Sequence, residues 1–242
     1  MTRGGRKLHV VTGKGGVGKS TVAAAIALAL AARGQRVLAI ELGGPGGLAR
    51  ILGAAAPSID ITGTGAAALA EYLTRKVRLG RFRGRLLAHP LYRAFAGAAP
   101  GVRELLAMGK VRDELVLQDR WDAVVVDAGA SGHALEHLRM PAAAARAFGA
   151  GLVHREAAVN AALLRDRAVC RVHVVATPEE MPVREALQVI GTLATLDVPL
   201  GAVIVNQCRP VAPDGVDAAI ARLDGELAAT ARRARGWEQI QE

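Results

Sequence analysis

The sequence predicts a doubly wound α/β fold, in which helices cover both faces of a mostly parallel sheet. Short apolar runs alternate with longer helical patterns, and parallel strands need such helical crossovers. The chain is 51% hydrophobic but only 3% aromatic, so Ala, Val, Leu and Ile must build the core. A glycine-rich segment joins the first apolar run to a helical pattern. The 242 residues suit a single domain spanning 1–242.

Short apolar runs mark the expected strands in chain order. The runs KLHVVT, RVLAIEL and DAVVVDA are rich in branched aliphatic residues, as buried strands are. We expect strands at 7–12, 36–42, 58–62, 122–128, 171–177 and 201–206.

Helical patterns fill most of the intervals between these runs. The glycine-rich segment opens a helix through about Arg33, which Gly34 ends. A break is expected at Met140–Pro141, because proline lacks the N–H that continues a helix. Further helices are expected at roughly 66–118, 133–165, 183–196 and 215–242, with 66–118 and 141–165 as insertions that form a small helical subdomain.

Composition narrows the class of protein. No apolar run is long enough to span a membrane, and no secretory signal is visible, so we expect a cytoplasmic protein. Cys170 and Cys208 lack C-x-x-C spacing and are expected to be core thiols. The net charge of +9 includes a dense basic stretch at 75–85. This stretch is either a solvated helix face or a contact for an anionic lipid or acidic partner, and the nucleic-acid signal is weak.

The segment GKGGVGKST carries a phosphate-binding motif. Residues 13–20 fit G-x-x-x-x-G-K-[ST]. Glycines let backbone N–H groups turn toward an anion, and the dipole of the following helix adds to the attraction. Lys19 is placed to neutralise the β- and γ-phosphates, and Ser20 to offer its hydroxyl to Mg²⁺. We therefore expect ATP and Mg²⁺ to bind here, with nucleotide contacts from Gly13, Lys14, Gly15, Gly16, Val17, Gly18, Lys19, Ser20 and Thr21.

A second lysine in this motif, Lys14, needs its own explanation. The pattern GKGGVGKST resembles the deviant P-loop of dimeric ATPases, which include ArsA, the tail-anchored-protein targeting ATPases, the nitrogenase iron protein and the partitioning ATPases. In that class the additional lysine reaches the phosphates bound by the other subunit. The resemblance implies a homodimer, or a heterodimer with a paralogue, in which Lys14 supplies positive charge across the interface. A solvated Lys14 is the alternative.

A second segment, residues 124–141, favours the ArsA-like family among these. Its sequence VVVDAGASGHALEHLRMP resembles the ArsA switch II pattern at Asp127, Gly132, His133 and Leu135, with Ser131 in place of threonine. Asp127 ends a strand, where a carboxylate can hold Mg²⁺ or its water shell. The resemblance implies that Gly132 contacts the nucleotide and that His133 senses its phosphate state. His137 and His154 are expected to be solvated.

Three further segments extend the resemblance over residues 7–210. APGVRELLAMGKV resembles the family's P-G-x-x-E segment, TPEEMPVREAL its P-E helix entry, and VNQCRP its N-Q-x-x-P adenine segment. The resemblance implies that Asn206 contacts the adenine ring, which its amide donor and acceptor suit. A strand cap is the alternative role of Asn206.

The chain departs from the family after the second strand. The family has a switch I aspartate that orients or activates the attacking water, and Gly43 stands in its place. Glu41 is the nearest carboxylate, and it is either a catalytic substitute or a strand-end residue without a catalytic role. The phosphate-binding segment is intact, so the departure threatens the rate of hydrolysis rather than binding.

These features lead to an expected function and two alternatives. We expect an ArsA-like, nucleotide-switched dimeric ATPase that binds ATP or ADP, with Lys14, Lys19, Glu41 and Asp127 as catalytic candidates. The first alternative is an ATP-binding, non-catalytic subunit or scaffold activated by a paralogue. The second is a positioning ATPase that acts on DNA or membrane. Two cysteines cannot form a three-thiolate arsenite site, so arsenite is not the expected client. The zinc clasp and the Met-rich groove of the targeting ATPases are missing as well. The sequence therefore does not identify the protein or membrane client.

Overall fold

A computed structural model of the chain describes residues 5–42, 47–53, 59–64, 101–118, 120–208 and 215–239. Its centre is a six-stranded sheet in the order β3-β2-β4-β1-β5-β6, and every strand pair is parallel. The doubly wound α/β prediction is confirmed. The strands are β1 (Lys7–Gly13), β2 (Val37–Glu41), β3 (Ile59–Gly63), β4 (Ala123–Ala130), β5 (Cys170–Ala176) and β6 (Leu200–Val205).

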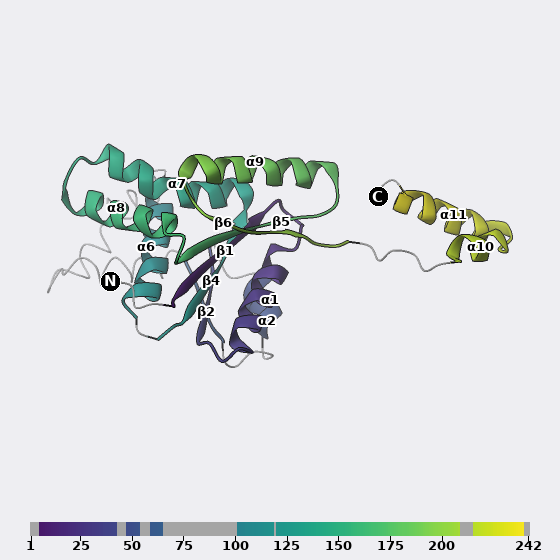
Figure 1. Cartoon of the computed structure of the whole chain (residues 1–242), viewed down its shortest axis with the longest axis horizontal. Coiled ribbons are helices and arrows are strands. Elements are labelled where there is room, and N and C mark those ends of the chain that lie inside the picture. Colours follow the sequence, from purple (N-terminus) through teal and green to yellow (C-terminus); the bar gives the residue numbers. More distant parts are fainter. Residues whose placement is uncertain are drawn as a thin grey trace, which may run out of the picture.

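Helices cover both faces of the sheet (Figure 1). On one face lie α1 (Lys19–Ala31) and α2 (Gly47–Leu52). On the other face lie α7 (Ser131–Ala147) and α9 (Glu180–Leu196), with α6 (Val102–Val116) and α8 (Gly151–Arg165) packed beside α7. This arrangement leaves the carboxyl ends of the strands open along one edge, where loops can form a site.

The period of two along each strand divides the core into two layers. On β1, Leu8 and Val10 belong to the cluster under α6, α7 and α9, whereas Val11 belongs to the cluster under α1 and α2. The same alternation on β4 turns Asp127 toward α1, because Val126 before it faces the α7 side. The side chain of Asp127 therefore meets the helix that follows the phosphate-binding segment.

The break expected at Met140–Pro141 is wrong. Helix α7 runs through Pro141, and the chain leaves the helical conformation only after Ala147. Pro141 is buried, so packing against the neighbouring elements offsets the one backbone hydrogen bond that proline removes. Gly151, with φ of 93°, stands at the actual turn into α8.

The prediction that both cysteines lie in the core is confirmed for one of them and wrong for the other. Cys170 is buried as expected, and burial raises the pKa of its thiol to about 12. Cys208 is exposed, which contradicts its expected core position, because it follows the last strand instead of lying within it.

The expected C-terminal helix is two helices, α10 (Val216–Ala221) and α11 (Gly225–Gln239), which lie beyond β6 and away from the sheet (Figure 1).

Some of the expected features fall on residues that the structure does not describe. Most of the expected helical region 66–118, including the basic stretch 75–85, lies outside the described residues, and α6 is its described part. Gly43 also lies outside them. Among the described helices, none combines the length and apolar character that crossing a membrane requires.

Candidate nucleotide-binding site

The phosphate-binding segment connects the central strand β1 to α1, and we call residues 13–20 the P-loop. Gly18 is the N-cap of α1, adopts the left-handed conformation and provides no side-chain cap. The N–H groups of the first turn of α1 therefore point to the open edge of the sheet without a capping side chain. An anion at this end of the helix meets both these donors and the helix dipole.

Two P-loop glycines are required by close contacts. A Cβ atom on Gly13 would lie 2.1 Å from the carbonyl oxygen of Val175 on β5, and Gly13 has φ of 154°. A Cβ atom on Gly18 would lie 2.2 Å from Nδ2 of Asn206. Glycine is needed at Gly13 because the neighbouring atom is backbone, and at Gly18 because φ is 89°, a conformation that other residues rarely adopt.

Lys19 folds back over the P-loop. Its Nζ donates a hydrogen bond to the main-chain oxygen of Lys14 at 2.9 Å. Burial lowers the pKa of Lys19, while the carboxylates of Asp127 and Glu185 act in the opposite direction. The ammonium thus contacts the backbone of the P-loop, and an incoming phosphate would find a positive charge already in position.

Ser20 and Asp127, the two residues predicted to hold Mg²⁺, are joined by a hydrogen bond. The hydroxyl of Ser20 donates to Oδ2 of Asp127 at 2.5 Å, and Asp127 is only 3% exposed. In the sheet register Asp127 pairs with Val11 on β1 and with Glu41 on β2. The sheet thereby brings together a hydroxyl and a carboxylate from segments 107 residues apart.

The start of the switch II segment, residues 127–133, contacts Leu42 after β2 and Glu185 on α9, and it also has one internal hydrogen bond. The main-chain oxygen of Asp127 accepts from the N–H of Leu42 at 2.9 Å, and its Oδ1 accepts from the N–H of Gly129 at 3.4 Å. Ser131, the first residue of α7, donates its hydroxyl to Oε1 of Glu185 on α9. Gly132, also a predicted contact, is exposed in the first turn of α7.

Glu185 is a residue that sequence reasoning missed. The segment TPEEMPVREAL was recognised as a helix entry, but nothing in its spacing distinguishes Glu185 from the exposed acids Glu179 and Glu180. One feature distinguishes Glu185 from these acids: it directly precedes Ala186, a buried position of α9. A carboxylate at the margin of a buried helix face often has a specific partner.

Two side chains that follow β6 bind the backbone of the P-loop. Asn206 donates its side-chain amide to the main-chain oxygen of Val17 at 2.8 Å, and Gln207 donates to that of Gly16 at 3.1 Å. Gln207 has φ of 58°, an unusual conformation for a residue other than glycine. Sequence reasoning named Asn206 but did not name Gln207. The two amides fix the outer turn of the P-loop in place.

Glu41 ends β2 beside this site and binds the start of α2. Its Oε1 accepts from the N–H groups of Gly47 at 2.9 Å and Leu48 at 3.4 Å. Gly47 in turn packs on Ser20, because a Cβ atom there would lie 2.8 Å from the serine hydroxyl oxygen. Gly47 therefore contacts both Glu41 and Ser20. The carboxylate of Glu41 is directed to the backbone amides at the start of α2.

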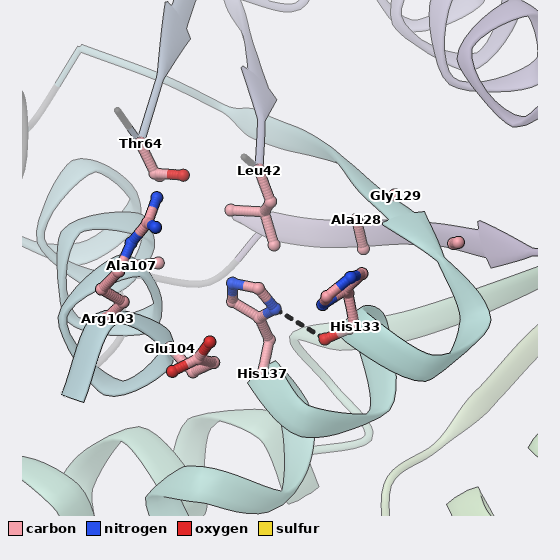
Figure 2. Close-up of a pocket in the computed structure, with 10 residues that line it drawn as sticks. Leu42, Thr64, Arg103, Glu104, Ala107, Ala128, Gly129, His133 and His137 are labelled. Carbon is pink, nitrogen blue, oxygen red and sulfur yellow. Dashed lines mark hydrogen bonds between the residues drawn. The ribbon is translucent and has the colours of Figure 1, made fainter. Parts of the chain in front are cut away.

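A cavity of about 280 Å³ lies beside the switch II segment, on the α6 and α7 side of the sheet (Figure 2). His133 and His137 line it, together with Leu42 after β2 and Arg103 on α6. His137 is half-buried and donates from Nδ1 to the main-chain oxygen of His133 at 2.7 Å. The expectation of solvated rings is therefore wrong for His137, and also for His154, which is half-buried and bonds Ala145.

Comparisons with known proteins place this site in a family. The profile of the CobQ/CobB/MinD/ParA nucleotide-binding domain matches residues 8–225. ATPase BagA of Mycobacterium tuberculosis is 36% identical over 255 aligned positions, which cover 95% of this chain and 73% of that protein. Protein Rv2184c of the same organism is 30% identical, over 83% of this chain and 59% of its own length.

The matched family is broader than the ArsA-like group that the sequence motifs indicate. Its domain description includes ParA and MinD, so the finer ArsA-like assignment stays a prediction. The match begins in β1 and extends into α11, and thus contains the P-loop, Asp127 and Asn206. The chain belongs to the CobQ/CobB/MinD/ParA family of P-loop nucleotide-binding domains.

Proposed function

We propose that this chain is a MgATP-binding switch protein of the ArsA-like type, with slow intrinsic ATP hydrolysis. The observation that carries the proposal is the contact of Ser20 with Asp127 at the uncapped start of α1, beside Lys19. A phosphate-binding turn, a lysine and a hydroxyl–carboxylate pair together are the parts that phosphoryl transfer requires. Relatives of this chain named as ATPases agree with the proposal.

The residues present fit a magnesium ion. Ser20 and Asp127 offer hard oxygen donors, which Mg²⁺ prefers. Within the described residues no group of three or more His, Cys, Asp or Glu side chains forms a metal site, and Mg²⁺ in such proteins takes its other ligands from water and phosphate. When bound, Mg²⁺ neutralises charge on the phosphates. Ser20 and Asp127 would hold it, and Lys19 would balance the remaining negative charge.

Lys14 supports a dimeric switch. Lys14 is half-buried in the P-loop, and its main-chain oxygen accepts the bond from Lys19. The lysine of the family pattern reaches the neighbouring subunit, so we assign Lys14 this role in a homodimer or in a heterodimer with a paralogue. ATP would favour the closed pair, because its phosphates then receive positive charge from both subunits.

Slow hydrolysis follows from the substitution at Gly43 and the contacts of Glu41. The carboxylate of Glu41 already accepts two backbone N–H groups of α2, which reduces its capacity to act on water. Water-positioning or general-base help commonly contributes about 10²- to 10⁴-fold to the rate. We therefore assign Glu41 a structural role at the start of α2, and expect Glu41→Gln to leave the residual rate within about twofold.

Phosphate release by the purified chain tests the proposed function. We expect slow, Mg²⁺-dependent turnover that Lys19→Ala abolishes, because the phosphate charge then lacks its main counter-charge. Lys7→Ala is the matched control, since Lys7 is an exposed lysine at the opposite end of β1. Turnover that survives Lys19→Ala would show that the hydrolysis occurs elsewhere.

A non-catalytic subunit is the second candidate, and the engagement of Glu41 by α2 favours it. In this case the chain binds ATP without turnover, and its Lys14 completes the site of a paralogue that carries the switch I aspartate. Gly43→Asp separates the two candidates. A rise in the rate of the homodimer would show that only the carboxylate is missing, whereas no turnover alone and full turnover with a paralogue would support the second candidate.

A further inference from the structure

The cavity beside the switch II segment takes no part in the proposed binding of ATP. Its volume of about 280 Å³ is close to the lower end of the range for small-molecule pockets. The described residues that line it follow β2 and β3, end β4, or belong to the first two turns of α6 and α7. None of these lining residues belongs to the P-loop. The cavity is therefore open to a small ligand other than the nucleotide phosphates.

One wall of the cavity is apolar. Leu42, Ala107 and Ala128 line it, and each of them is at most 8% exposed. All three belong to the core cluster that lies between the sheet and the α6–α7 layer. A ligand with a small aliphatic part would cover this wall and remove apolar surface from water.

Arg103 and Glu104 bring opposite charges to the same cavity from adjacent positions on α6. Figure 2 shows that their side chains diverge: the guanidinium of Arg103 extends toward Thr64, and the carboxylate of Glu104 points away from it. Arg103 is exposed and Glu104 is half-buried. Neither charged group has an ion-pair or hydrogen-bond partner among the described residues. The cavity thus offers a positive and a negative charge at two separate points.

The ring of His137 adds a neutral polar group to the cavity. Its Nδ1 donates to the main-chain oxygen of His133 at 2.7 Å, so Nε2 of the neutral ring is an acceptor. Figure 2 shows this second nitrogen turned away from His133. An ammonium or hydroxyl group of a ligand would find an acceptor here in addition to the carboxylate of Glu104.

We propose that this cavity binds a free α-amino acid with a small apolar side chain. The carboxylate of the amino acid accepts from the guanidinium of Arg103, and its ammonium donates to the carboxylate of Glu104. Its side chain packs against Leu42, Ala107 and Ala128. A ligand with a single charge would displace water from both protein charges but satisfy only one of them, which costs free energy. The inference does not depend on nucleotide at the P-loop.

Calorimetric titration of the nucleotide-free full chain with L-valine and L-leucine tests the site. We expect saturable binding of one molecule per chain. N-acetyl-L-leucine lacks the ammonium and L-leucine amide lacks the carboxylate. Each should bind at least about tenfold more weakly than L-leucine, because each loses one charge-assisted contact. No binding of either amino acid, or equal affinity for the three leucine compounds, would overturn the proposal.

Two variants on α6 assign the two ends of the ligand. Glu104→Gln should weaken the binding of L-leucine about tenfold and leave that of N-acetyl-L-leucine within about twofold. Arg103→Gln should weaken L-leucine to a similar extent and leave L-leucine amide within about twofold. If both variants weaken all three compounds alike, Arg103 and Glu104 do not contact the two charges of the ligand, and the proposal is wrong.

Each variant has a matched control outside the cavity. Glu114→Gln changes a half-buried acid of α6, and Arg139→Gln changes an exposed arginine of α7 that pairs with Glu136. Neither residue lines the cavity. Both controls should leave the affinity for L-leucine within about twofold. A loss in the controls equal to that in Glu104→Gln and Arg103→Gln would contradict the assignment of this cavity.

NMR spectra locate the bound amino acid. L-leucine should shift the ring signals of His133 and His137, which line the cavity, and leave those of His9 on β1 unchanged. Shifts at His9 without shifts at His133 and His137 would overturn the proposal by placing the ligand elsewhere. Absence of amino-acid binding leaves the proposed function intact, because MgATP binding at the P-loop is measured separately. Failure to bind MgATP would likewise leave the amino-acid site unaffected.

Discussion

Gly13 is the residue at which β1 turns into the P-loop, and its lack of a side chain lets the chain pass β5. A Cβ atom there would lie 2.1 Å from the oxygen of Val175, and the neighbouring atom is backbone that cannot rotate away. We expect Gly13→Ala to lower the free energy of unfolding by roughly 1–3 kcal/mol through overpacking and backbone strain. Urea unfolding of the nucleotide-free chain measures this.

Gly15→Ala is the matched control for Gly13. Gly15 is exposed in the same loop, and a Cβ atom there would have no neighbour within 4 Å. Its unfolding free energy should stay within about 0.5 kcal/mol of the wild type. Equal losses in both variants would show that the tight contact with β5 does not limit this position.

His9 and His173 form a stacked pair on β1 and β5, with His9 Nδ1 3.0 Å from His173 Nε2. The N–H of Ala202 donates to Nδ1 of His173, so the other nitrogen of His173 carries the proton that bonds His9. Burial, followed by the charges of His173, Lys7 and Arg171, lowers the pKa of His9 to about 4. The folded state thus holds this ring neutral.

The histidine pair predicts a pH dependence of stability. Between about pH 6.5 and 4 the unfolded chain binds a proton at His9 that the folded chain does not, so stability falls as the pH falls. We expect a loss of roughly 1–2 kcal/mol over this window, since water partly screens a half-buried ring. Urea unfolding as a function of pH measures it. His9→Gln should reduce the slope and His133→Gln, at an exposed ring, should keep it; an unchanged slope in His9→Gln would contradict the assignment.

At the scale of elements, α6 and α8 are joined by a buried cation. Arg112 on α6 contacts Glu156 on α8 at 2.7 Å and Asp113 at 2.9 Å, and its side chain is 8% exposed. Removing the guanidinium leaves two carboxylates near each other at a helix–helix contact. Arg112→Ala should therefore lower the free energy of unfolding by about 2–3 kcal/mol.

Arg139 provides the comparison for this ion pair. It pairs with Glu136 at 3.6 Å on the surface of α7, and both side chains are about half exposed. Arg139→Ala should change stability by less than about 0.5 kcal/mol, as exposed ion pairs contribute little. Thermal unfolding of both variants decides the point, and equal effects would show that the burial of Arg112 has no energetic consequence.

The elements also show what the sequence could predict and what it could not. The six strands and the P-loop were predictable, because apolar runs and the spacing of glycines and lysines are local signals. Helix α7 through Pro141 was not, since its continuity depends on packing with other elements. Glu185 was missed because its partner Ser131 lies 54 residues away, and only the fold brings them together.

At the scale of the whole molecule, the parallel sheet converts separate motifs into one site. The P-loop begins at the end of β1, Asp127 lies near the end of β4 and Asn206 follows β6, and these three parallel strands end at the same edge. This is the edge at which parallel α/β sheets bind their ligands. Lys14, which we propose contacts a second subunit, belongs to the P-loop at this edge.

Lys14 should therefore affect assembly more than binding by one subunit. With a non-hydrolysable ATP analogue, sedimentation velocity should show the wild type shifting from monomer to dimer, alone or with a paralogue. Lys14→Ala should weaken this shift by about tenfold or more in affinity, because phosphate charge across the interface loses its counter-charge. If analogue and paralogue leave the wild type monomeric, the role of Lys14 in the partner's site is wrong.

Calorimetric titration of the full chain with MgATP is the most direct measurement of the account, because every larger claim depends on nucleotide held by the P-loop. The account predicts saturable binding of one nucleotide per chain. Lys19→Ala should weaken it by at least about tenfold, and Lys7→Ala should leave it unchanged. Equal affinity of the wild type and Lys19→Ala, or no binding by the folded wild type, would contradict the proposal that this chain is an ATP-binding switch.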